Sequence, residues 1–333
     1  MNKTLKFGIL GAGMAANLHA TALKDVECAE LVGIADASTK RAEEFADKYG
    51  VRAFSSFDEM LKGDLDAICI CTPSYYHADN AIAAMRAGKH VIIEKPMALS
   101  VEDADRIIAV SRETGRLVSV VSQFRFSENF TRLKSAIDNG EFGKISLCTL
   151  TMKYYRSEEY YSSSDWKGTL KYDGGGALMN QGIHGVDLVQ YLMGGVKRAS
   201  GRVATLYHNI ETEDTAVASV EFENGALGVI VGSTCATPGF ARTIEINGDR
   251  GYAIFKENSF EKFVIDGKEI EVQAKVSINS ASDPAALDIG MHTRQLTNFV
   301  RAIFGEEKLL IDGDEGKKAV KIITDIYASS KNG

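Results

Sequence analysis

The sequence predicts an α/β protein in two parts. An N-terminal doubly wound parallel sheet of the Rossmann type is followed by a C-terminal α+β domain with a large, mostly antiparallel open sheet. In the first third of the chain, almost continuously apolar runs alternate with amphipathic stretches, as expected for strands covered on both faces. A glycine-rich turn follows the first run, and strand-like segments separated by hairpin turns fill much of the second half.

The first domain, which we place at residues 1–122, is predicted to alternate strands with helices. Strands are expected at 5–10, 29–35, 67–71, 90–93 and 117–121, and helices at 14–24, 40–49, 76–87 and 101–114. Open parallel sheets bind ligands at the carboxyl ends of their strands, so candidate binding residues are sought there.

The second domain, placed at residues 123–333, has a different order of predicted helices and strands. A helix at 129–139 and a strand at 145–155 lead to a polar loop and a long helix at 176–193. Further strands are expected at 199–206, 215–221, 226–232, 242–247, 251–256 and 262–265, and closing helices at 289–304 and 316–329. We expect this domain to bind substrate and to support oligomers, with a C-terminal helix able to pack back on the first domain.

Composition excludes several classes of partner. The chain has 333 residues and a net charge of −7, which gives no electrostatic support for binding nucleic acid or an anionic membrane. It contains no apolar run of about 18 residues and no signal-peptide pattern at its start. Its five cysteines are odd in number, and we expect buried reduced thiols, a cytoplasmic protein and no metal site.

The first strand leads into a dinucleotide-binding pattern. Residues 11–16 read Gly-Ala-Gly-Met-Ala-Ala, which fits G-x-G-x-x-G/A at the start of a helix. Asp36 ends the second strand, where a carboxylate accepts hydrogen bonds from the ribose of NAD. We therefore predict NAD as the cofactor. NADP stays open, because Lys40 and Arg41 lie close enough to hold a 2′-phosphate, although a solvated first helical turn also explains them.

Two other segments contain candidate catalytic residues. Lys95 lies in Glu94-Lys95-Pro96, directly after a strand, and is either an acid–base group or a surface lysine at a strand end. Asn180, His184 and Asp187 follow a triple glycine at spacings of four and three, which places them on one face of a helix. That stripe fits either a catalytic site or ordinary packing.

Three segments resemble the Gfo/Idh/MocA oxidoreductases in order and spacing: GAGMAA, TPSYYHADNAIAAMRAGKHVIIEKP and DGGGALMNQGIHGVDL. The resemblance implies a Rossmann domain followed by an open-sheet domain. It also implies oxidation of a ring hydroxyl on a sugar, cyclitol or nucleotide sugar, or reduction of the ketone. Lys95 matches the lysine of the EKP segment, His184 matches the helix histidine, and His77 matches the histidine of TP…H, expected near the cofactor.

One position departs from the family pattern. Inositol dehydrogenase-type members have Asp four residues before the histidine, whereas this chain has Asn180. The sequence around Asn180, GGGALMNQGIH preceded by DWKGT, is similar to that of the family branch that oxidises the 3-hydroxyl of nucleotide-linked sugars. An asparagine cannot raise the basicity of His184 by its charge, but it can still bind a substrate hydroxyl.

The predicted site therefore has three groups of residues. Lys95 and His184 are catalytic, with Lys95 as first choice for the base. The substrate-binding candidates are Gln123, Arg125, Tyr154, Arg156, Asn180 and Asp187. The cofactor-binding candidates are Gly11, Gly13, Met14, Ala15, Asp36, Arg41, Thr72, Pro73, His77, Glu94, Lys95 and Trp166.

Two other functions compete with the dehydrogenase. One is a glycosidase that oxidises its substrate transiently with tightly held NAD, and the other is a cofactor-binding regulator without turnover. Net NADH production separates the first from a dehydrogenase. We expect a small carbohydrate-like substrate and a homodimer or homotetramer, because an open sheet needs a cover.

Overall fold

The computed structural model describes residues 3–271 and 289–332. The chain divides into two compact units: Met1–Gln123 with Asp288–Lys317, and Phe124–Leu287 with Lys318–Gly333. The first boundary lies one residue beyond the expected one. Residues 288–317, which the sequence placed in the second domain, group with the first unit because helix α9 (Ile289–Ile303) packs on α1 (Met14–Leu23).

The first unit contains a six-stranded parallel sheet with the order β3-β2-β1-β4-β5-β6. Its strands are β1 (Leu5–Leu10), β2 (Ala29–Ala35), β3 (Arg52–Ala53), β4 (Ala67–Ile70), β5 (His90–Ile93) and β6 (Val118–Val120). Its other helices are α2 (Thr39–Tyr49), α3 (Phe57–Lys62), α4 (His77–Arg86), α5 (Val101–Thr114) and the short η1 (Ser74–Tyr76). The doubly wound parallel sheet is confirmed.

Burial explains why these runs form strands. Every residue of β4 is buried, and so are Phe7 and Ile9 of β1. The Phe7 ring meets Phe299 of α9 edge-on, with ring centroids 6.4 Å apart, which fastens that helix to the sheet. Strand β3 and helix α3 were not expected, because two and six residues are too short to show a period.

The second unit is built on an eight-stranded sheet with the order β14-β13-β12-β11-β7-β10-β9-β8. Strand β7 is parallel to β10 and antiparallel to β11, and the remaining pairs are antiparallel. The strands are β7 (Ile145–Lys153), β8 (Val196–Ala204), β9 (Thr215–Phe222), β10 (Leu227–Ser233), β11 (Thr243–Gly248), β12 (Gly251–Lys256), β13 (Ser259–Ile265) and β14 (Lys268–Glu269). The mostly antiparallel sheet is confirmed.

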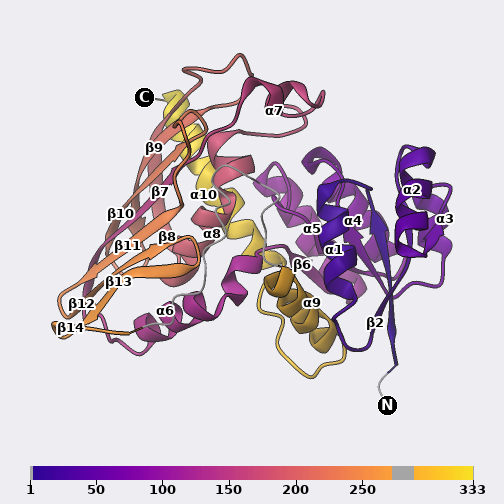
Figure 1. Ribbon diagram of the computed structural model, residues 1–333, viewed down its shortest axis with the longest axis horizontal. Coiled ribbons are helices and arrows are strands. Elements are labelled where there is room, and N and C mark those ends of the chain that lie inside the picture. Colours follow the sequence, from indigo (N-terminus) through magenta and orange to yellow (C-terminus); the bar gives the residue numbers. More distant parts are fainter. Residues whose placement is uncertain (1–2, 272–288, 333) are drawn as a thin grey trace. The chain divides into compact units, whose positions relative to one another are not determined.

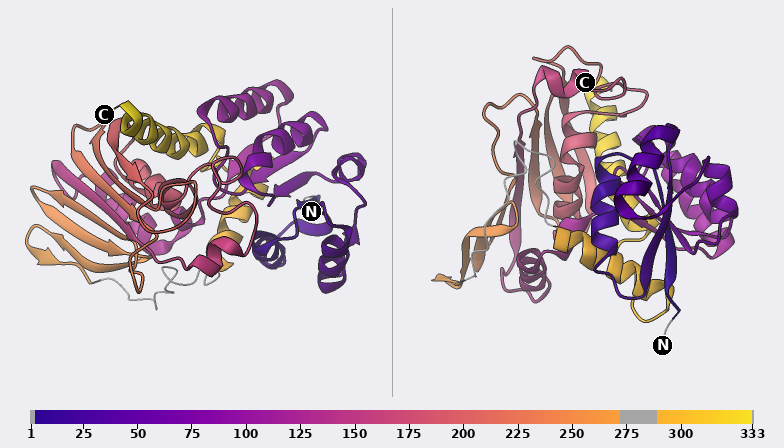
Figure 2. Two further views of the ribbon diagram at one scale, coloured as in Figure 1. Left: turned by 90° about the horizontal axis from the view of Figure 1, so that it is seen from above. Right: turned by 45° about the vertical axis from the view of Figure 1, so that its right-hand side comes forward.

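Helices lie on one face of this sheet (Figures 1 and 2). They are α6 (Glu128–Asp138), α8 (Ile183–Leu192) and the greater part of α10 (Gly313–Asn332). The opposite face has no helix from the described residues. Alternate residues of β7, among them Leu150 and Met152, are buried toward the helices, which is the period-two pattern of a sheet covered on one side.

Two helical segments of this unit differ from expectation, and the two-residue strand β14 was not expected. The polar loop contains a short helix, α7 (Glu158–Ser162), capped by the Ser157 side chain. The long helix expected at 176–193 begins instead as a π-helical turn, η3 (Ala177–Gly182), and becomes α-helical only at Ile183. None of the helices in the described ranges is long and apolar enough to cross a membrane.

Candidate active site

The glycine turn after β1 is built for a close approach of two backbones. Gly11 has a φ of +98°, and a Cβ there would lie 2.6 Å from the carbonyl oxygen of Cys71. A Cβ on Gly13, in contrast, would meet no atom within 4 Å. Gly13 is the N-cap of α1 and no side chain caps that end, so the helix presents backbone N–H groups beside open space. These features fit the pyrophosphate of a dinucleotide.

Asp36 is held in place at the end of β2. Its Oδ2 accepts the N–H of Ala12 at 2.8 Å, and its Oδ1 accepts the N–H of Ser38 at 2.8 Å. Arg41 donates to Oδ1 from Nε and Nη2, at 3.1 and 2.7 Å. The carboxylate is therefore tied to the glycine turn, in the position expected for a ribose-binding acid.

His77 links the turns that follow β4 and β5. Its Nε2 lies 2.8 Å from the carbonyl oxygen of Thr72, and its Nδ1 lies 2.7 Å from that of Pro96. The ring is buried, and burial lowers the pKa of His77. Asn80 adds a hydrogen bond to the Thr72 hydroxyl at 3.2 Å. This histidine holds the two turns together from within the unit.

The EKP turn follows β5. Glu94 Oε1 lies 2.9 Å from His19 Nε2, and Glu94 Oε2 accepts the backbone N–H of Lys95 at 3.3 Å. Lys95 itself is half-buried. Since β2, β1, β4 and β5 are neighbours in a parallel sheet, Asp36, the glycine turn, Thr72 and Lys95 all lie at its carboxyl edge.

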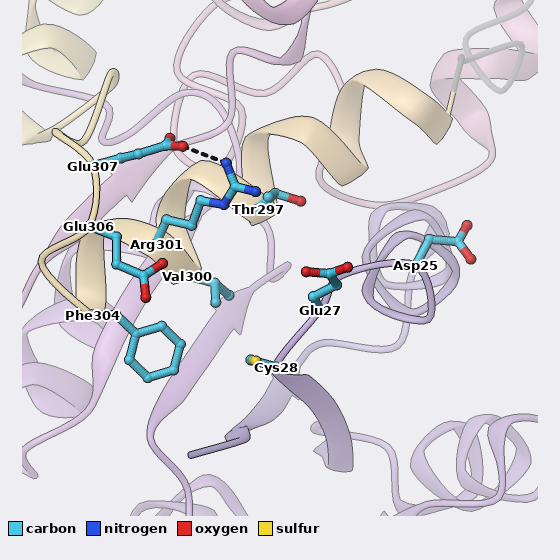
Figure 3. A pocket seen from close by; sticks show the side chains of 9 residues that line it. All are labelled: Asp25, Glu27, Cys28, Thr297, Val300, Arg301, Phe304, Glu306 and Glu307. Carbon is cyan, nitrogen blue, oxygen red and sulfur yellow. Dashed lines mark hydrogen bonds and ion pairs between the residues drawn. The ribbon is translucent and has the colours of Figure 1, made fainter. Parts of the chain in front are cut away.

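A separate hollow lies at the opposite edge of the same sheet (Figure 3). It is formed by the loop before β2 and the C-terminal end of α9, and Arg301 donates to Glu307 beside it. The residues that line it are Asp25, Glu27, Cys28, Thr297, Val300, Arg301, Phe304, Glu306 and Glu307. Its place at the amino ends of the strands separates it from the dinucleotide-binding turn.

In the second unit, the triple glycine allows the π-helical turn to begin against the loop that precedes β9. A Cβ on Gly176 would lie 2.1 Å from the carbonyl oxygen of Glu213. The Glu213 carboxylate accepts the N–H groups of Gly176 and Leu178 at 2.9 and 2.8 Å, and the Tyr327 hydroxyl at 2.7 Å. Burial raises the pKa of Glu213. This residue had no assigned role in the sequence, because only the fold brings it to the helix start.

The π-turn changes the stripe that was expected from a continuous α-helix. Asn180 belongs to η3, His184 to the first turn of α8, and Asp187 to the following turn. A turn with an i→i+5 pattern rotates the residues that follow it, so the predicted single α-helical face is corrected. Asn180 Nδ2 donates to Asp173 Oδ1 at 2.5 Å, which places a buried carboxylate beside the asparagine.

Arg156 lies in a cluster of aromatic and amide groups. Its Nε donates to Gln181 Oε1 at 2.9 Å, and its guanidinium lies 5.7 and 5.6 Å from the ring centroids of Tyr154 and Tyr160. Gln181 Nε2 in turn donates to the Tyr160 hydroxyl at 2.9 Å and to Asn180 Oδ1 at 3.1 Å. Burial lowers the pKa of Arg156.

Arg125 and Asp187 contact each other. Arg125 Nε donates to Asp187 Oδ2 at 2.8 Å and Nη2 donates to Oδ1, and both side chains are almost completely buried. The pair joins the turn η2 (Gln123–Phe126) to α8. The Phe124 ring packs edge-on against the His184 ring at 5.1 Å, so the same turn also supports the histidine.

The remaining candidates lie apart from these networks. Gln123 is buried at the end of the first unit, and Trp166 is half-buried in the loop between α7 and η3. Asp173, Gln181 and Tyr160 were not assigned as site residues. Asp173 directly precedes the three glycines and Gln181 directly follows Asn180. These positions in the motif could have indicated both as site residues.

Another polar cluster, formed by His208, Asp214 and Cys235, lies at the loop before β9. The Asp214 carboxylate accepts the N–H groups of residues 206–208 and the Thr215 hydroxyl. His208 Nε2 lies 2.8 Å from the Arg156 carbonyl oxygen, and Cys235 Sγ lies 3.6 Å from His208 Nδ1. These hydrogen bonds order the backbone next to Arg156.

Comparison with known proteins identifies the protein family. Residues 5–122 match the oxidoreductase family with an NAD-binding Rossmann fold, and residues 130–254 match the GFO/IDH/MocA C-terminal domain. The chain belongs to the Gfo/Idh/MocA oxidoreductase family. It is an NAD(P)-dependent dehydrogenase, and the family resemblance predicted from its motifs is confirmed.

Several relatives match this family member over most of its length. It is 28% identical to myo-inositol 2-dehydrogenase of Thermotoga maritima, over 98% of this chain and 96% of that protein. It is 29% identical to glucose-6-phosphate 3-dehydrogenase of Bacillus subtilis, over 84% and 82% of the two chains. The WlbA dehydrogenase of Bordetella pertussis, solved with NADH and UDP-GlcNAcA, is 31% identical with a TM-score of 0.90, covering 100% and 97%.

Proposed function

We propose that this dehydrogenase transfers a hydride between NAD and a ring carbon of a nucleotide-linked sugar with an acidic group. The observation that supports this substrate class is the cluster of the buried Arg156 with the half-buried Gln181 and Tyr160. A guanidinium whose planar donors are held by an amide and aromatic rings suits a carboxylate. The WlbA dehydrogenase, similar over the whole chain, was solved with UDP-GlcNAcA.

Lys95 and His184 are proposed as the acid–base groups. Asp36 and the glycine turn would hold NAD, which would supply the hydride acceptor for oxidation or the hydride donor for reduction. Lys95 takes the proton of the substrate hydroxyl during oxidation, and His184 shares that hydroxyl or relays the proton. Asn180, oriented by Asp173, accepts or donates a hydrogen bond at a neighbouring hydroxyl. Arg125 and Asp187 act on the reaction by holding α8 and the turn beneath His184.

The experiment is a turnover assay with NAD and a panel of UDP-sugars, UDP-hexuronates, free sugars and cyclitols. We expect the UDP-hexuronates to give the highest kcat/KM, with NADH accumulating in step with oxidised product. Accumulating NADH separates this reaction from a glycosidase that recycles its cofactor. Turnover of free cyclitols at a higher kcat/KM than any UDP-sugar would contradict the proposed substrate class.

The same assay tests the catalytic residues. Lys95→Ala and His184→Ala are each expected to lower kcat by about 10²–10⁴-fold, the usual contribution of a positioned acid–base group. Binding of NADH, followed by its fluorescence, is expected to persist in both variants because the glycine turn and Asp36 are intact. Unchanged kcat in both variants would refute the assignment.

We also infer self-association through the open face of the eight-stranded sheet. The sheet register places five partly exposed apolar side chains on that face: Leu147, Val217, Leu227, Val229 and Tyr252. Val217 and Leu227 are 52% and 61% exposed. Exposed apolar side chains on an open sheet face favour an isologous contact between two copies of the chain, which gives a homodimer or a homotetramer.

We also propose a cytoplasmic location, on the basis of the cysteines. All five cysteines are free thiols, two of them buried, although Cys69 and Cys71 are only two residues apart. Reduced thiols are typical of a reducing compartment.

A further inference from the structure

A buried cluster of ionisable side chains adjoins the turn that contains Lys95. His19 comes from α1, Glu94 follows β5, and His292 comes from α9. His19 Nε2 lies 2.9 Å from Glu94 Oε1, and the rings of His19 and His292 meet edge-on with centroids 6.0 Å apart. The side chains of His19 and Glu94 are 1% and 13% exposed, so water screens their interaction only weakly.

Glu94 connects this cluster to the peptide of Lys95. Its Oε1 atom lies within hydrogen-bond distance of His19 Nε2, and its Oε2 atom accepts the backbone N–H of Lys95. His77 holds the next residue through the Pro96 carbonyl oxygen. The turn is therefore held by side chains from α1 and α4, which makes the position of Lys95 depend on contacts outside its own segment.

The charges around His19 identify Glu94 as the anion of the cluster. His19 faces the thiols of Cys69 and Cys71 from the β4 side, the His292 ring, and Glu94, which adjoins Lys95. Burial raises the pKa of Cys71 to about 11, so this thiol stays neutral. Burial opposes ionisation of Glu94 as well, but the hydrogen bond and charge of His19, with the charges of His292 and Lys95, lower its pKa to about 2.

We propose that His19 is a positioning residue for the reaction: it holds Glu94 in place as an anion, and Glu94 orients Lys95. This inference rests on the proposed acid–base role of Lys95. Outer-shell partners of this kind commonly change activity by about 10–100-fold without touching the substrate. Without the His19 donor, the carboxylate loses the hydrogen bond and the charge of His19 and takes up a proton nearer to neutral pH. The anion beside Lys95 then disappears, which favours the neutral amine.

The experiment compares His19→Ala, His19→Gln and Glu94→Gln with the unaltered enzyme. Competitive acylation of lysines across a pH range, read by peptide mass spectrometry, reports the titration midpoint of the Lys95 amine without any turnover. We expect His19→Ala and Glu94→Gln to move that midpoint to lower pH. We expect kcat to fall by about 10–100-fold while KM for the sugar changes by less than about threefold. His19→Gln keeps an N–H donor and should recover part of both losses.

His90→Gln is the matched control. His90 lies on the same strand as the EKP turn but at its other end, where its Nδ1 accepts the N–H of Leu117. This variant is expected to leave the Lys95 midpoint and kcat unchanged. The proposal is overturned if His19→Ala leaves the midpoint where it was, or if His90→Gln shifts it equally. If Lys95→Ala keeps full turnover, the proposed base is wrong, whereas the acylation midpoint still decides whether His19 acts on Lys95.

Discussion

Buried carboxylates set much of the local chemistry in both units. Glu94 is held by His19, Asp187 by Arg125, and Glu213 by two backbone N–H groups and the Tyr327 hydroxyl. An ion taken out of water is costly unless it gains a partner of opposite charge or good hydrogen bonds. The pKa of Glu94 is lowered by its cationic partners, whereas burial raises the pKa of Glu213, whose described hydrogen-bond donors are neutral.

The depressed pKa of Glu94 predicts a specific loss of stability in acid. A carboxyl group with a pKa of about 2 in the folded state and 4.5 as its ordinary value stabilises the fold above pH 4.5. This contribution decreases as the pH falls toward 2. Between pH 5 and pH 3 it amounts to about 2 kcal/mol of unfolding free energy, because one pKa unit corresponds to about 1.4 kcal/mol.

Urea unfolding of the unaltered protein and of Glu94→Gln, measured at pH 5 and pH 3, checks this value. His19 is protonated in both the folded and the unfolded chain in this range, so the carboxyl group supplies the difference. We expect the two proteins to differ in their pH dependence by about 2 kcal/mol. Identical pH dependence would show that Glu94 is not ionised in the fold.

At the scale of elements, the π-helical turn η3 sets the geometry of the second unit's site. It places Asn180 beside Asp173 and Gln181 beside Arg156, while the following α8 carries His184. A π-turn is less favourable than an α-turn, and it persists only where surrounding contacts compensate. Here the compensation comes from Glu213, which accepts two N–H groups at the start of the turn.

A substitution at Gly176 tests this dependence. The Cβ of Gly176→Ala would lie 2.1 Å from the backbone oxygen of Glu213, so the turn has to move away from the loop before β9. We expect a loss of roughly 2–4 kcal/mol in unfolding free energy and a clear fall in kcat. Gly225→Ala is the control, because Gly225 has a φ of +84° but open space around its Cβ position. It should cost only about 1 kcal/mol and leave kcat unchanged.

At the scale of the whole molecule, each unit is organised around one sheet, and the two sheets differ in what covers them. The parallel sheet of the first unit is buried between helices, as its apolar strands require. The second sheet has helices on one face (Figure 1). Exposed apolar side chains of β7, β9, β10 and β12 lie on the other face. A monomer would leave these apolar side chains in water, which is why we propose that two copies cover them.

A charge on this face tests the proposal. Leu227 and Val229 are both exposed at the middle of the sheet, in β10. The double substitution Leu227→Lys and Val229→Lys places like charges across an isologous contact and is expected to yield monomers in sedimentation-velocity experiments. Lys268→Glu, on the edge strand β14, is the control and should keep the oligomer. Monomers in the unaltered protein at micromolar concentration would contradict the proposal.

The sequence by itself determined the features that depend on residues close together along the chain. The apolar runs of β1, β2 and β5 were predicted with the bounds that the structure has, because buried parallel strands need continuous apolar residues. The glycine turn and Asp36 were equally readable, since a dinucleotide needs backbone and carboxylate at a set spacing. These features were enough to predict a nicotinamide dinucleotide as the cofactor, and the EKP and triple-glycine segments were needed to recognise the family.

Only the tertiary structure decided how the remaining polar residues are used. His19 and Glu94 are 75 residues apart, and Arg125 and Asp187 are 62 apart, so no local pattern reveals that they are pairs. The π-turn depends in the same way on Glu213, which lies in the loop before β9. Residues 288–317 join the first unit through α9. Local sequence records the propensity and the spacing of a segment. The partner that neutralises a buried charge comes from elsewhere in the chain, so the dinucleotide turn was predictable and the setting of Lys95 was not.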